Sequence, residues 1–307
     1  MATADDADIE LTLQFLRDMA NLRVDDALAV VADDIVHKNG DLPTVRGKAR
    51  FARVMRRINS PLVHFDAEIT NIAAADGVVL NERIDLLRVG PLRLRFWVCG
   101  RFTVRDGLIT EWVDYFDMVD VAKAVVRGVV GLVIPRAVRP IHSTLTADAA
   151  ASLPAASTAA AGTADSAAID LTTDFLRDLA LGRVDDAVAL VDDDLLYQNV
   201  GLPDVRGKQR FTSVMRGLES PRVGFDVEID EAVAADGVVL NERIDELRFG
   251  PLRLRFWVFG RFEVRDGRIV VWRDHFDTFN MVKALGRGVV GIALPRALKP
   301  IRSVTGA

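Results

Sequence analysis

Asp76-Gly-Val-Val-Leu-Asn-Glu-Arg-Ile-Asp85 recurs without change as Asp236-Gly-Val-Val-Leu-Asn-Glu-Arg-Ile-Asp245, 160 positions further along the chain. Each copy opens on an Asp-Gly turn signal and continues as a run of residues that is typical of a β-strand. The match extends without a gap from about residues 9/169 to residues 141/301. This period is far longer than the roughly 20–50 residues of a solenoid repeat. The chain is therefore predicted to hold one globular domain twice, in tandem.

The segment between the copies is made of small residues. Residues 145–168 are almost entirely Ala, Ser, Thr, Gly and Asp, a composition that is typical of a flexible linker. We predict the first domain at residues 1–144, the linker at 145–168 and the second domain at 169–307. Such a linker spans on the order of 25–30 Å. The halves are thus expected to pack side by side as an internal pseudo-dimer, and the chain to sediment as a monomer.

Composition excludes several classes of partner. Half of the residues are hydrophobic, so each half can bury a core without metals or disulfides. A formal charge of −5 gives no general attraction to nucleic acid or to anionic membranes. The N-terminus has no basic region, and no apolar run approaches the roughly 20 residues of a membrane span. The single cysteine, Cys99, excludes an intrachain disulfide and suits a reducing compartment. We predict a soluble, cytoplasmic protein.

Each copy is predicted to begin with helices and to continue with strands. In the first copy, helical spacing covers residues 9–22, 24–31 and 46–57, strand-rich runs cover 65–72, 78–89, 92–104 and 108–116, and a last amphipathic helix covers 119–134. Helices followed by an antiparallel meander predict an α+β domain, with helices on one face of a curved sheet. The stretch 197–203 of the second copy is interpreted as a loop.

Charged residues fall on the apolar face of the predicted sheet. Alternation places Arg83 and Asp85 on one face of their strand, and Asp114 beside Trp112 on the last strand. The second copy repeats the pattern with Arg243, Asp245, Trp272 and Asp274. Buried charges are costly unless they are paired, so each trio is expected to make contact. Two interpretations stay open: a structural ion pair, or one protonated and one ionised carboxyl group for acid/base chemistry. Paired carboxylates also serve glycosidases, so spacing alone names no reaction.

Tyr197 and Asn199 add a second candidate feature. A hydroxyl and an amide two residues apart are able to hold one water molecule. The alternative interpretation is a polar surface turn.

Three motifs together resemble the limonene-1,2-epoxide hydrolase family. They are Tyr-Gln-Asn-x-x-Leu-Pro at 197–203, Glu-Arg-Ile-Asp-x-Leu-Arg at 242–248 and Gly-Arg-Ile-x-x-Trp-Arg-Asp-x-Phe-Asp at 267–277. With the mirrored copy, the resemblance covers nearly all the chain outside the linker and the two C-terminal tails. It implies two tandem cone-shaped domains, each a strongly curved mixed sheet wrapped by helices around a deep apolar pocket. The wider nuclear-transport-factor-two-like superfamily also holds ketosteroid isomerases and polyketide cyclases, so the fold alone does not fix the function.

The resemblance also implies a reaction. Water would add directly to an apolar, cyclic, terpenoid or sterol-like epoxide and give a vicinal diol, without a covalent enzyme ester, a metal or a cofactor. Asp274 would act as general base, and protonated Asp245 would donate to the epoxide oxygen. Arg243 would lie between the two carboxyl groups. Tyr197 and Asn199 would hold the water.

The first copy departs from this pattern at two positions. The equivalents that it keeps are Asn39, Arg83, Asp85 and Asp114. His37 stands in place of the tyrosine. It could still hold water through a ring nitrogen, but a protonated imidazole could not accept the hydrogen bond of that water. Lys38 replaces the glutamine and is expected to bring a cation near the pocket entrance. We expect the C-terminal site to be active and the N-terminal site to be slower, altered in substrate choice or lost.

Two other functions stay open. An isomerase or cyclase of the same superfamily needs one carboxylate base and a separate oxyanion donor, which the Asp–Arg–Asp set fits less well. A non-catalytic carrier of hydrophobic ligands would bind them regardless of the charge on Asp245 or Asp274. For the hydrolase, the pocket is expected to be lined by residues such as Leu254, Phe256, Trp257 or Val258, depending on strand register.

The apolar stretches that close the two copies, residues 127–141 and 287–301, contain basic residues and prolines. They are expected to pack over the pocket mouth or against the other half. A weak contact with a membrane surface is the alternative.

Overall fold

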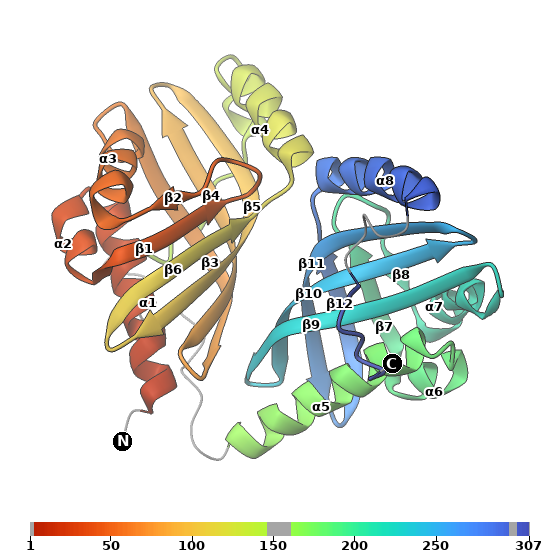
Figure 1. Cartoon of the computed structure of the whole chain (residues 1–307). Coiled ribbons are helices and arrows are strands. Elements are labelled where there is room, and N and C mark those ends of the chain that lie inside the picture. The colour runs from red at the N-terminus through yellow and green to blue at the C-terminus, as the bar shows by residue number, and fades with distance from the viewer. Residues whose placement is uncertain (1–2, 146–160, 295–299, 307) are drawn as a thin grey trace. The chain divides into compact units, whose positions relative to one another are not determined.

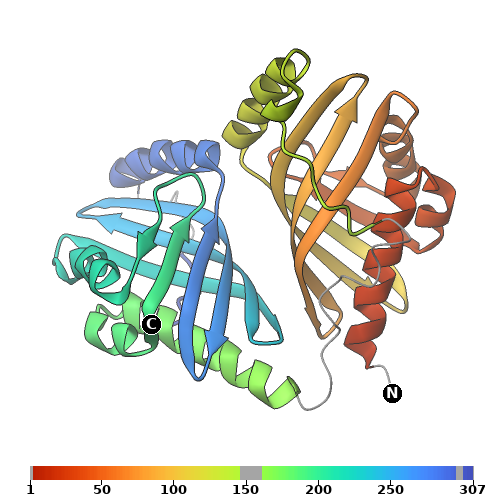
Figure 2. The same ribbon diagram turned by 180° about the vertical axis from the view of Figure 1, so that it is seen from behind.

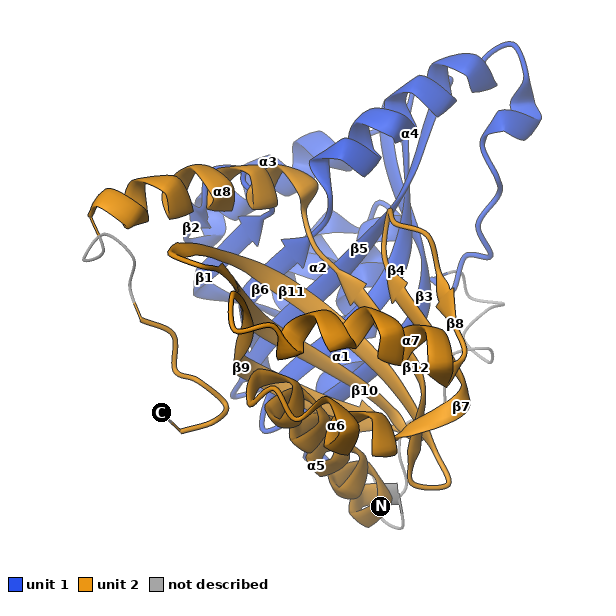
Figure 3. Ribbon diagram, turned by 90° about the vertical axis from the view of Figure 1, so that its right-hand side faces the viewer, with its two compact units in different colours: residues 1–156 blue, residues 157–307 orange. Residues whose placement is uncertain are grey.

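The computed structural model describes residues 3–145, 161–294 and 300–306. The chain divides into two compact units, residues 1–156 and 157–307, which Figure 3 distinguishes by colour. Residues 146–160 of the predicted linker lie outside the described residues. The rest of that linker differs from the prediction. Residues 161–168 are helical, and Leu145 is buried in the core of the first unit with 1% of its surface exposed.

Both units contain the same succession of elements (Figure 1). In unit 1 these are α1 (Ala4–Ala20), α2 (Val24–Ala29), β1 (Val31–Asn39), β2 (Val45–Arg46), α3 (Lys48–Ile58), β3 (Val63–Ala75), β4 (Val78–Val89), β5 (Leu92–Arg105), β6 (Leu108–Tyr115), α4 (Met118–Gly131) and the short 3-10 helix η1 (Pro135–Ala137). In unit 2 they are α5 (Ala161–Ala180), α6 (Val184–Ala189), β7 (Val191–Asn199), β8 (Val205–Arg206), α7 (Lys208–Met215), the 3-10 helix η3 (Arg216–Glu219), β9 (Val223–Ala235), β10 (Val238–Phe249), β11 (Leu252–Arg265), β12 (Arg268–His275) and α8 (Thr278–Ala293).

Each unit is built on one six-stranded mixed sheet. The strand order is β2-β1-β6-β5-β4-β3 in unit 1 and β8-β7-β12-β11-β10-β9 in unit 2. The four long strands form the predicted antiparallel meander, with Asp76 and Gly77 both at positive φ in the first tight turn. β1 pairs with β6, and β7 with β12, in the parallel direction. This makes the sheets mixed, and the predicted α+β class is confirmed.

The strands β1 and β7 correct one prediction. Tyr197 and Asn199 belong to strand β7 and not to a loop. Two features hid the strand: Asp192, Asp193 and Asp194 make its first half look like exposed coil, and its partner β12 lies more than 70 residues further along the chain. Parallel pairing over such a separation leaves no local signal in the sequence.

The helices close one face of each sheet over an aromatic core. In unit 2, Phe175 of α5 and Phe211 of α7 pack on Phe262 and Trp272 of the sheet, with ring centroids 5.0–6.2 Å apart. Unit 1 repeats this core with Phe15, Phe51, Phe102 and Trp112.

The last helix of each unit crosses an edge of the sheet. β6 pairs only with residues 99–105 of β5, so within the described residues α4 is what lies along the other part of that edge. Arg127 donates to the carbonyl oxygen of Arg95 at 3.4 Å, and a Cβ on Gly128 would come 2.8 Å from the carbonyl oxygen of Arg93. The helix approaches this closely because it has glycine at the contact.

The chain after α4 crosses one face of the sheet, in front of the strands in the view of Figure 2. It ends at the free edge of β3, where the Thr144 amide donates to the carbonyl oxygen of Ala67 at 3.1 Å. Residues 137–139 contact the face of the sheet that is turned away from the core. For residues 137–139 the first alternative, packing over the pocket mouth, is therefore wrong, and packing of the tails against the other half stays a prediction.

Candidate active site

Arg243, in the middle of β10, is the centre of the candidate site in unit 2. None of its side chain is exposed to solvent. Its Nε donates to Asp245 Oδ1 at 2.8 Å, and its Nη1 donates to Asn241 Oδ1 at 2.9 Å. Its Nη2 donates to Asp274 Oδ2 at 2.7 Å and lies 3.3 Å from Asp245 Oδ2. The guanidinium group thus bridges two carboxyl groups, which is how a fully buried charge is tolerated.

Asp274 reaches this cluster from the neighbouring part of the sheet. It lies on β12 opposite Gly260 of β11, and β11 separates β12 from β10, the strand of Arg243. Its Oδ1 accepts a hydrogen bond from Trp272 Nε1 at 2.8 Å. Because separate donors hold its two oxygens, the carboxylate is fixed in orientation. Asp245 and Asp274 are 6% and 3% exposed, so water reaches both only in part.

The two carboxyl groups sit in different electrostatic environments. Burial raises the pKa of Asp245 to about 6, the charge of Asp274 acts in the same direction, and Arg243 opposes both. Burial lowers the pKa of Arg243, but the two carboxylates outweigh it and leave that pKa above its ordinary value. Arg243 therefore stays charged, and Asp245 takes up its proton at a higher pH than an ordinary aspartate does.

Tyr197 and Asn199 reach the site from β7, on the side next to β12. Asn199 Nδ2 donates to the Tyr197 hydroxyl oxygen at 2.6 Å. Burial raises the pKa of Tyr197, so the phenol keeps its proton. The hydroxyl is therefore able to donate onward, and the amide oxygen of Asn199 remains an acceptor.

These groups open onto one cavity of about 470 Å³, within the size range of small-molecule sites. Its polar lining residues are Tyr197, Asn199, Asp245 and Asp274, and most of the others are apolar. Phe256 and Val258 line it as predicted, whereas Leu254 and Trp257 are not among its lining residues. Trp257 pairs with Ile244, on the opposite face of the sheet from Arg243.

Unit 1 repeats the charged cluster. Arg83 Nε donates to Asp85 Oδ1 at 2.9 Å, and Arg83 Nη2 lies 2.8 Å from Asp114 Oδ1. That same oxygen accepts from Trp112 Nε1 at 2.7 Å, whereas in unit 2 the two donors use different oxygens. Burial raises the pKa of Asp85 to about 6. Asn39 occupies the end of β1, opposite Asp114.

The His37 ring occupies the place of the Tyr197 ring, but its hydrogen bond is made to a different partner. Its centroid lies 4.4 Å from that of Trp112, as the Tyr197 centroid lies 4.5 Å from that of Trp272. His37 Nδ1 is 3.2 Å from the carbonyl oxygen of Trp112. Since a carbonyl only accepts, Nδ1 carries the proton, and burial lowers the pKa of the ring. The ring is neutral, and its one N–H is used on the backbone.

Lys38 does not lie where the sequence suggested. Its neighbours His37 and Asn39 face the site, so alternation turns Lys38 to the opposite face of the sheet. There its Nζ binds Glu111 at 2.7 Å. The equivalent Gln198 accepts a hydrogen bond from Arg273 on the same face of unit 2. The predicted cation at the pocket entrance is therefore wrong.

The positioning role of three residues was not predicted, although alternation had already placed Trp272 beside Asp274. Asn241 holds Arg243 Nη1, Trp272 holds Asp274, and a Cβ on Gly260 would come 2.1 Å from Arg243 Nη1. Unit 1 has the same residues as Asn81, Trp112 and Gly100. Their identity in both copies was the one signal that could have found them.

Metal-binding clusters and membrane-spanning helices are both absent from the described ranges. No group of three His, Cys, Asp or Glu there is arranged to hold a metal ion. Within the same ranges, no helix is both long and apolar enough to cross a membrane.

Comparison with known proteins gives a match in each half. The sequence model of the limonene-1,2-epoxide hydrolase catalytic domain matches residues 7–127 and 166–287. Epoxide hydrolase EphG of Mycobacterium tuberculosis (strain ATCC 25618 / H37Rv) is 46% identical over 121 residues, which are 39% of this chain and 80% of that protein.

Solved structures that resemble the chain each cover about one unit of it. A limonene-epoxide-hydrolase-like epoxide hydrolase of M. tuberculosis is 42% identical, with a TM-score of 0.43, over 45% of this chain and 97% of its own. A protein described as a putative polyketide cyclase, from Xanthomonas campestris pv. campestris, is 20% identical, with a TM-score of 0.36, over 40% and 99%.

Proposed function

The chain belongs to the limonene-1,2-epoxide hydrolase family, and we propose that it adds water directly to an apolar epoxide and releases a vicinal diol. The observation that carries this proposal is the buried bridge from Asp245 through Arg243 to Asp274 at the wall of an apolar cavity. The bridge keeps an acid and a base at one site, which ring opening by water requires.

Asp274 is the proposed general base. With Oδ1 bound to Trp272 and Oδ2 bound to Arg243, its carboxylate keeps free lone pairs for a proton from water. The water would donate its other proton to Asn199 Oδ1 and accept from the Tyr197 hydroxyl. These residues would hold its oxygen with a lone pair turned toward the substrate.

Asp245 is the proposed general acid. A pKa of about 6 leaves about a tenth of this group protonated at pH 7, against about a thousandth for an ordinary aspartate. As the water oxygen forms its bond to a ring carbon, the carbon–oxygen bond of the epoxide breaks. The epoxide oxygen then takes the proton of Asp245. Asp274 has gained one proton and Asp245 has lost one, so one proton must return before the next turnover.

The cavity sets the proposed class of substrate. Apart from the catalytic groups, its lining is mainly hydrocarbon, including Leu247, Phe256 and Met281. A cyclic, terpenoid or sterol-like epoxide would bury its apolar body there, at roughly 25 cal/mol per Å² of apolar surface. A cavity of this kind discriminates weakly among such substrates, by about 1–3 kcal/mol per methylene group.

We assign turnover mainly to unit 2. Unit 1 keeps Asp85, Arg83 and Asp114, but His37 has no hydroxyl group to donate to the water, and its N–H is used on Trp112. Slower turnover or altered substrate choice follows for unit 1.

The test is diol formation from a panel of cyclic, terpenoid and sterol epoxides. The intact chain is compared with Asp274→Asn, Asp114→Asn and the double variant. We expect activity to vanish with Asp274→Asn and to survive Asp114→Asn. No turnover of any epoxide, with apolar ligands still bound, would instead favour a carrier, or an isomerase or cyclase. The cytoplasmic location and the monomeric state also stay predictions, and sedimentation of the whole chain tests the second.

A further inference from the structure

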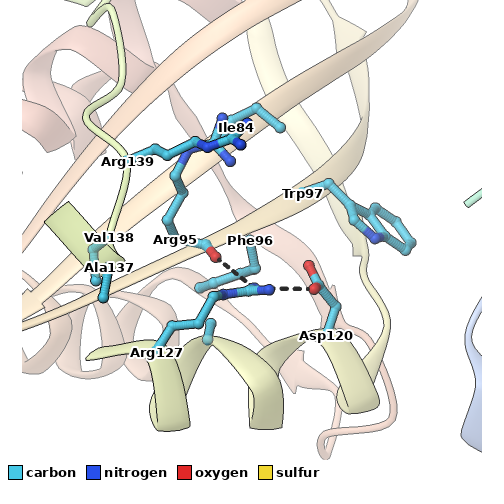
Figure 4. A pocket seen from close by; sticks show the side chains of 10 residues that line it. Ile84, Arg95, Phe96, Trp97, Asp120, Arg127, Ala137, Val138 and Arg139 are labelled. Carbon is cyan, nitrogen blue, oxygen red and sulfur yellow. Dashed lines mark hydrogen bonds and ion pairs between the residues drawn. The ribbon is translucent and has the colours of Figure 1, made fainter. Parts of the chain in front are cut away.

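A second cavity in unit 1 lies outside the candidate active site. Its volume is about 370 Å³, and it lies between β5, helix α4 and the chain after α4 (Figure 4). Its lining residues are Ile84, Arg95, Phe96, Trp97, Asp120, Ala124, Arg127, Ala137, Val138 and Arg139. Ile84, Arg95 and Trp97 alternate along their strands with the residues that face the active site, so they point to the other face of the sheet.

The charges around this cavity do not balance. Three guanidinium groups line it, from Arg95, Arg127 and Arg139, but only one carboxylate, that of Asp120. Asp120 Oδ1 binds Arg127 Nη2 at 3.1 Å, as the dashed line in Figure 4 marks. Among the described residues, the side chains of Arg95 and Arg139 make no ion pair. Two positive charges are thus left without a partner.

Unit 2 has a buried carboxylate at the position where unit 1 has none. Arg95 pairs across the strands with Leu86, and the equivalent Arg255 pairs with Glu246. Glu246 is 1% exposed and binds both Arg255 and Arg253. Leucine at position 86 removes that carboxylate from unit 1 and leaves the arginine.

Arg95 is partly buried in spite of this loss. Its Nε is covered and donates to no atom of the described chain. Removing a charged donor from water without a partner is unfavourable, so such a group calls for an explanation. Arg139 and Arg127 approach the same space from the tail and from α4. Their planar guanidinium groups suit phosphate and carboxylate oxygens, which they bind with two parallel hydrogen bonds.

We propose that this cavity binds a phosphate monoester with a small apolar body. The phosphate dianion matches the two unbalanced charges and would lie between Arg95 and Arg139, beside Arg127. The apolar body would pack on Ile84 and Trp97. Two acidic residues of β3 share this face. Asp66, opposite Leu86, accepts from Ser143 Oγ at 2.5 Å and from the Ala67 amide, and Glu68, opposite Ile84, accepts from the His142 amide at 3.1 Å.

Calorimetric titration of the full chain tests the proposal with three probes: phenyl phosphate, benzoate and inorganic phosphate. We expect phenyl phosphate to bind tightest. Leu86→Glu gives unit 1 the carboxylate that unit 2 has at this position. It should lower the affinity for phenyl phosphate by about tenfold or more, which is the size of one lost hydrogen bond to a charged group. Arg139→Met should lower the affinity for phenyl phosphate by a similar factor. Because Arg139 is exposed, this variant avoids the risk that a buried glutamate disturbs folding.

Arg255→Met is the matched control in unit 2, where Glu246 already neutralises the arginine, and it should leave binding unchanged. Binding that survives both Leu86→Glu and Arg139→Met, or that is lost in Arg255→Met, would overturn the proposal. Equal affinities for benzoate and phenyl phosphate would also overturn the proposal. No turnover is measured, so the outcome is independent of epoxide hydrolysis.

Discussion

Gly260 lies directly beneath the guanidinium group of Arg243, and a Cβ at this position would come 2.1 Å from Arg243 Nη1. The same Cβ would come 2.4 Å from Asn241 Oδ1, which holds that nitrogen. Arg243 is wholly buried and is held by Asp245 and Asp274, so it is unable to move aside without losing these contacts. Because Gly260 has no side chain, Arg243 has room to bridge the two carboxyl groups.

Gly260→Ala should consequently displace Arg243 and remove hydrolysis while the sheet stays paired. We expect kcat to fall by about a hundredfold or more, as when a general acid or base is lost. Diol formation measures this, with circular dichroism to confirm the fold. Gly100→Ala places the same methyl group against Arg83 in unit 1 and is the matched control. An equal loss in both variants would contradict the assignment of turnover to unit 2.

Tyr197→Phe removes only the hydroxyl that Asn199 contacts. The ring contacts with Phe211 and Trp272 remain, so the melting temperature should change little. One net hydrogen bond of about 1 kcal/mol corresponds to roughly a fivefold fall in rate, and we expect at least this loss in kcat. Unchanged kcat would remove Tyr197 from the proposed water site.

His37→Tyr should raise the activity of unit 1. The imidazole already stacks on Trp112 as Tyr197 stacks on Trp272, so the phenol ring has a place. The experiment uses Asp274→Asn to silence unit 2 and compares diol formation with and without His37→Tyr. Adding Asp114→Asn should abolish any gain. If diol formation does not rise, the residue at position 37 is not what limits the activity of unit 1.

The rate should depend on the proton of Asp245. Burial raises its pKa to about 6, and the acid form is lost as the pH rises through that value. We therefore expect kcat to decline above about pH 6, at most tenfold per pH unit, and not from pH 4 as for an ordinary aspartate. A profile of kcat between pH 4 and 9 measures this. A rate that stays flat up to pH 9 would show that Asp245 is not the acid.

Local pattern predicted much of the fold. The range predicted for β4, residues 78–89, is the observed one, because Asp-Gly and Gly-Pro turns bound it and its neighbours pair with it in sequence order. The first helix was predicted to begin at residue 9, whereas Thr3 caps it and it begins at Ala4. β1 and β7 were missed, since their partners are remote in sequence.

The composition of the site was readable from the chain alone, and the resemblance implied that Arg243 lies between the two carboxyl groups. Local pattern without that resemblance did not determine this arrangement. Alternation along a strand is a local property, so it identified Arg243 and Asp245 as neighbours on one face. Asp274 stands 31 residues further on, and its contact with Arg243 depends on the register of β12 against β11. Lys38 points away from the pocket because residues 31–39 form a strand, which pairs with the remote β6. Strand register also places Arg95 opposite a leucine. Such contacts are set by the pairing of distant strands, which only the folded chain determines.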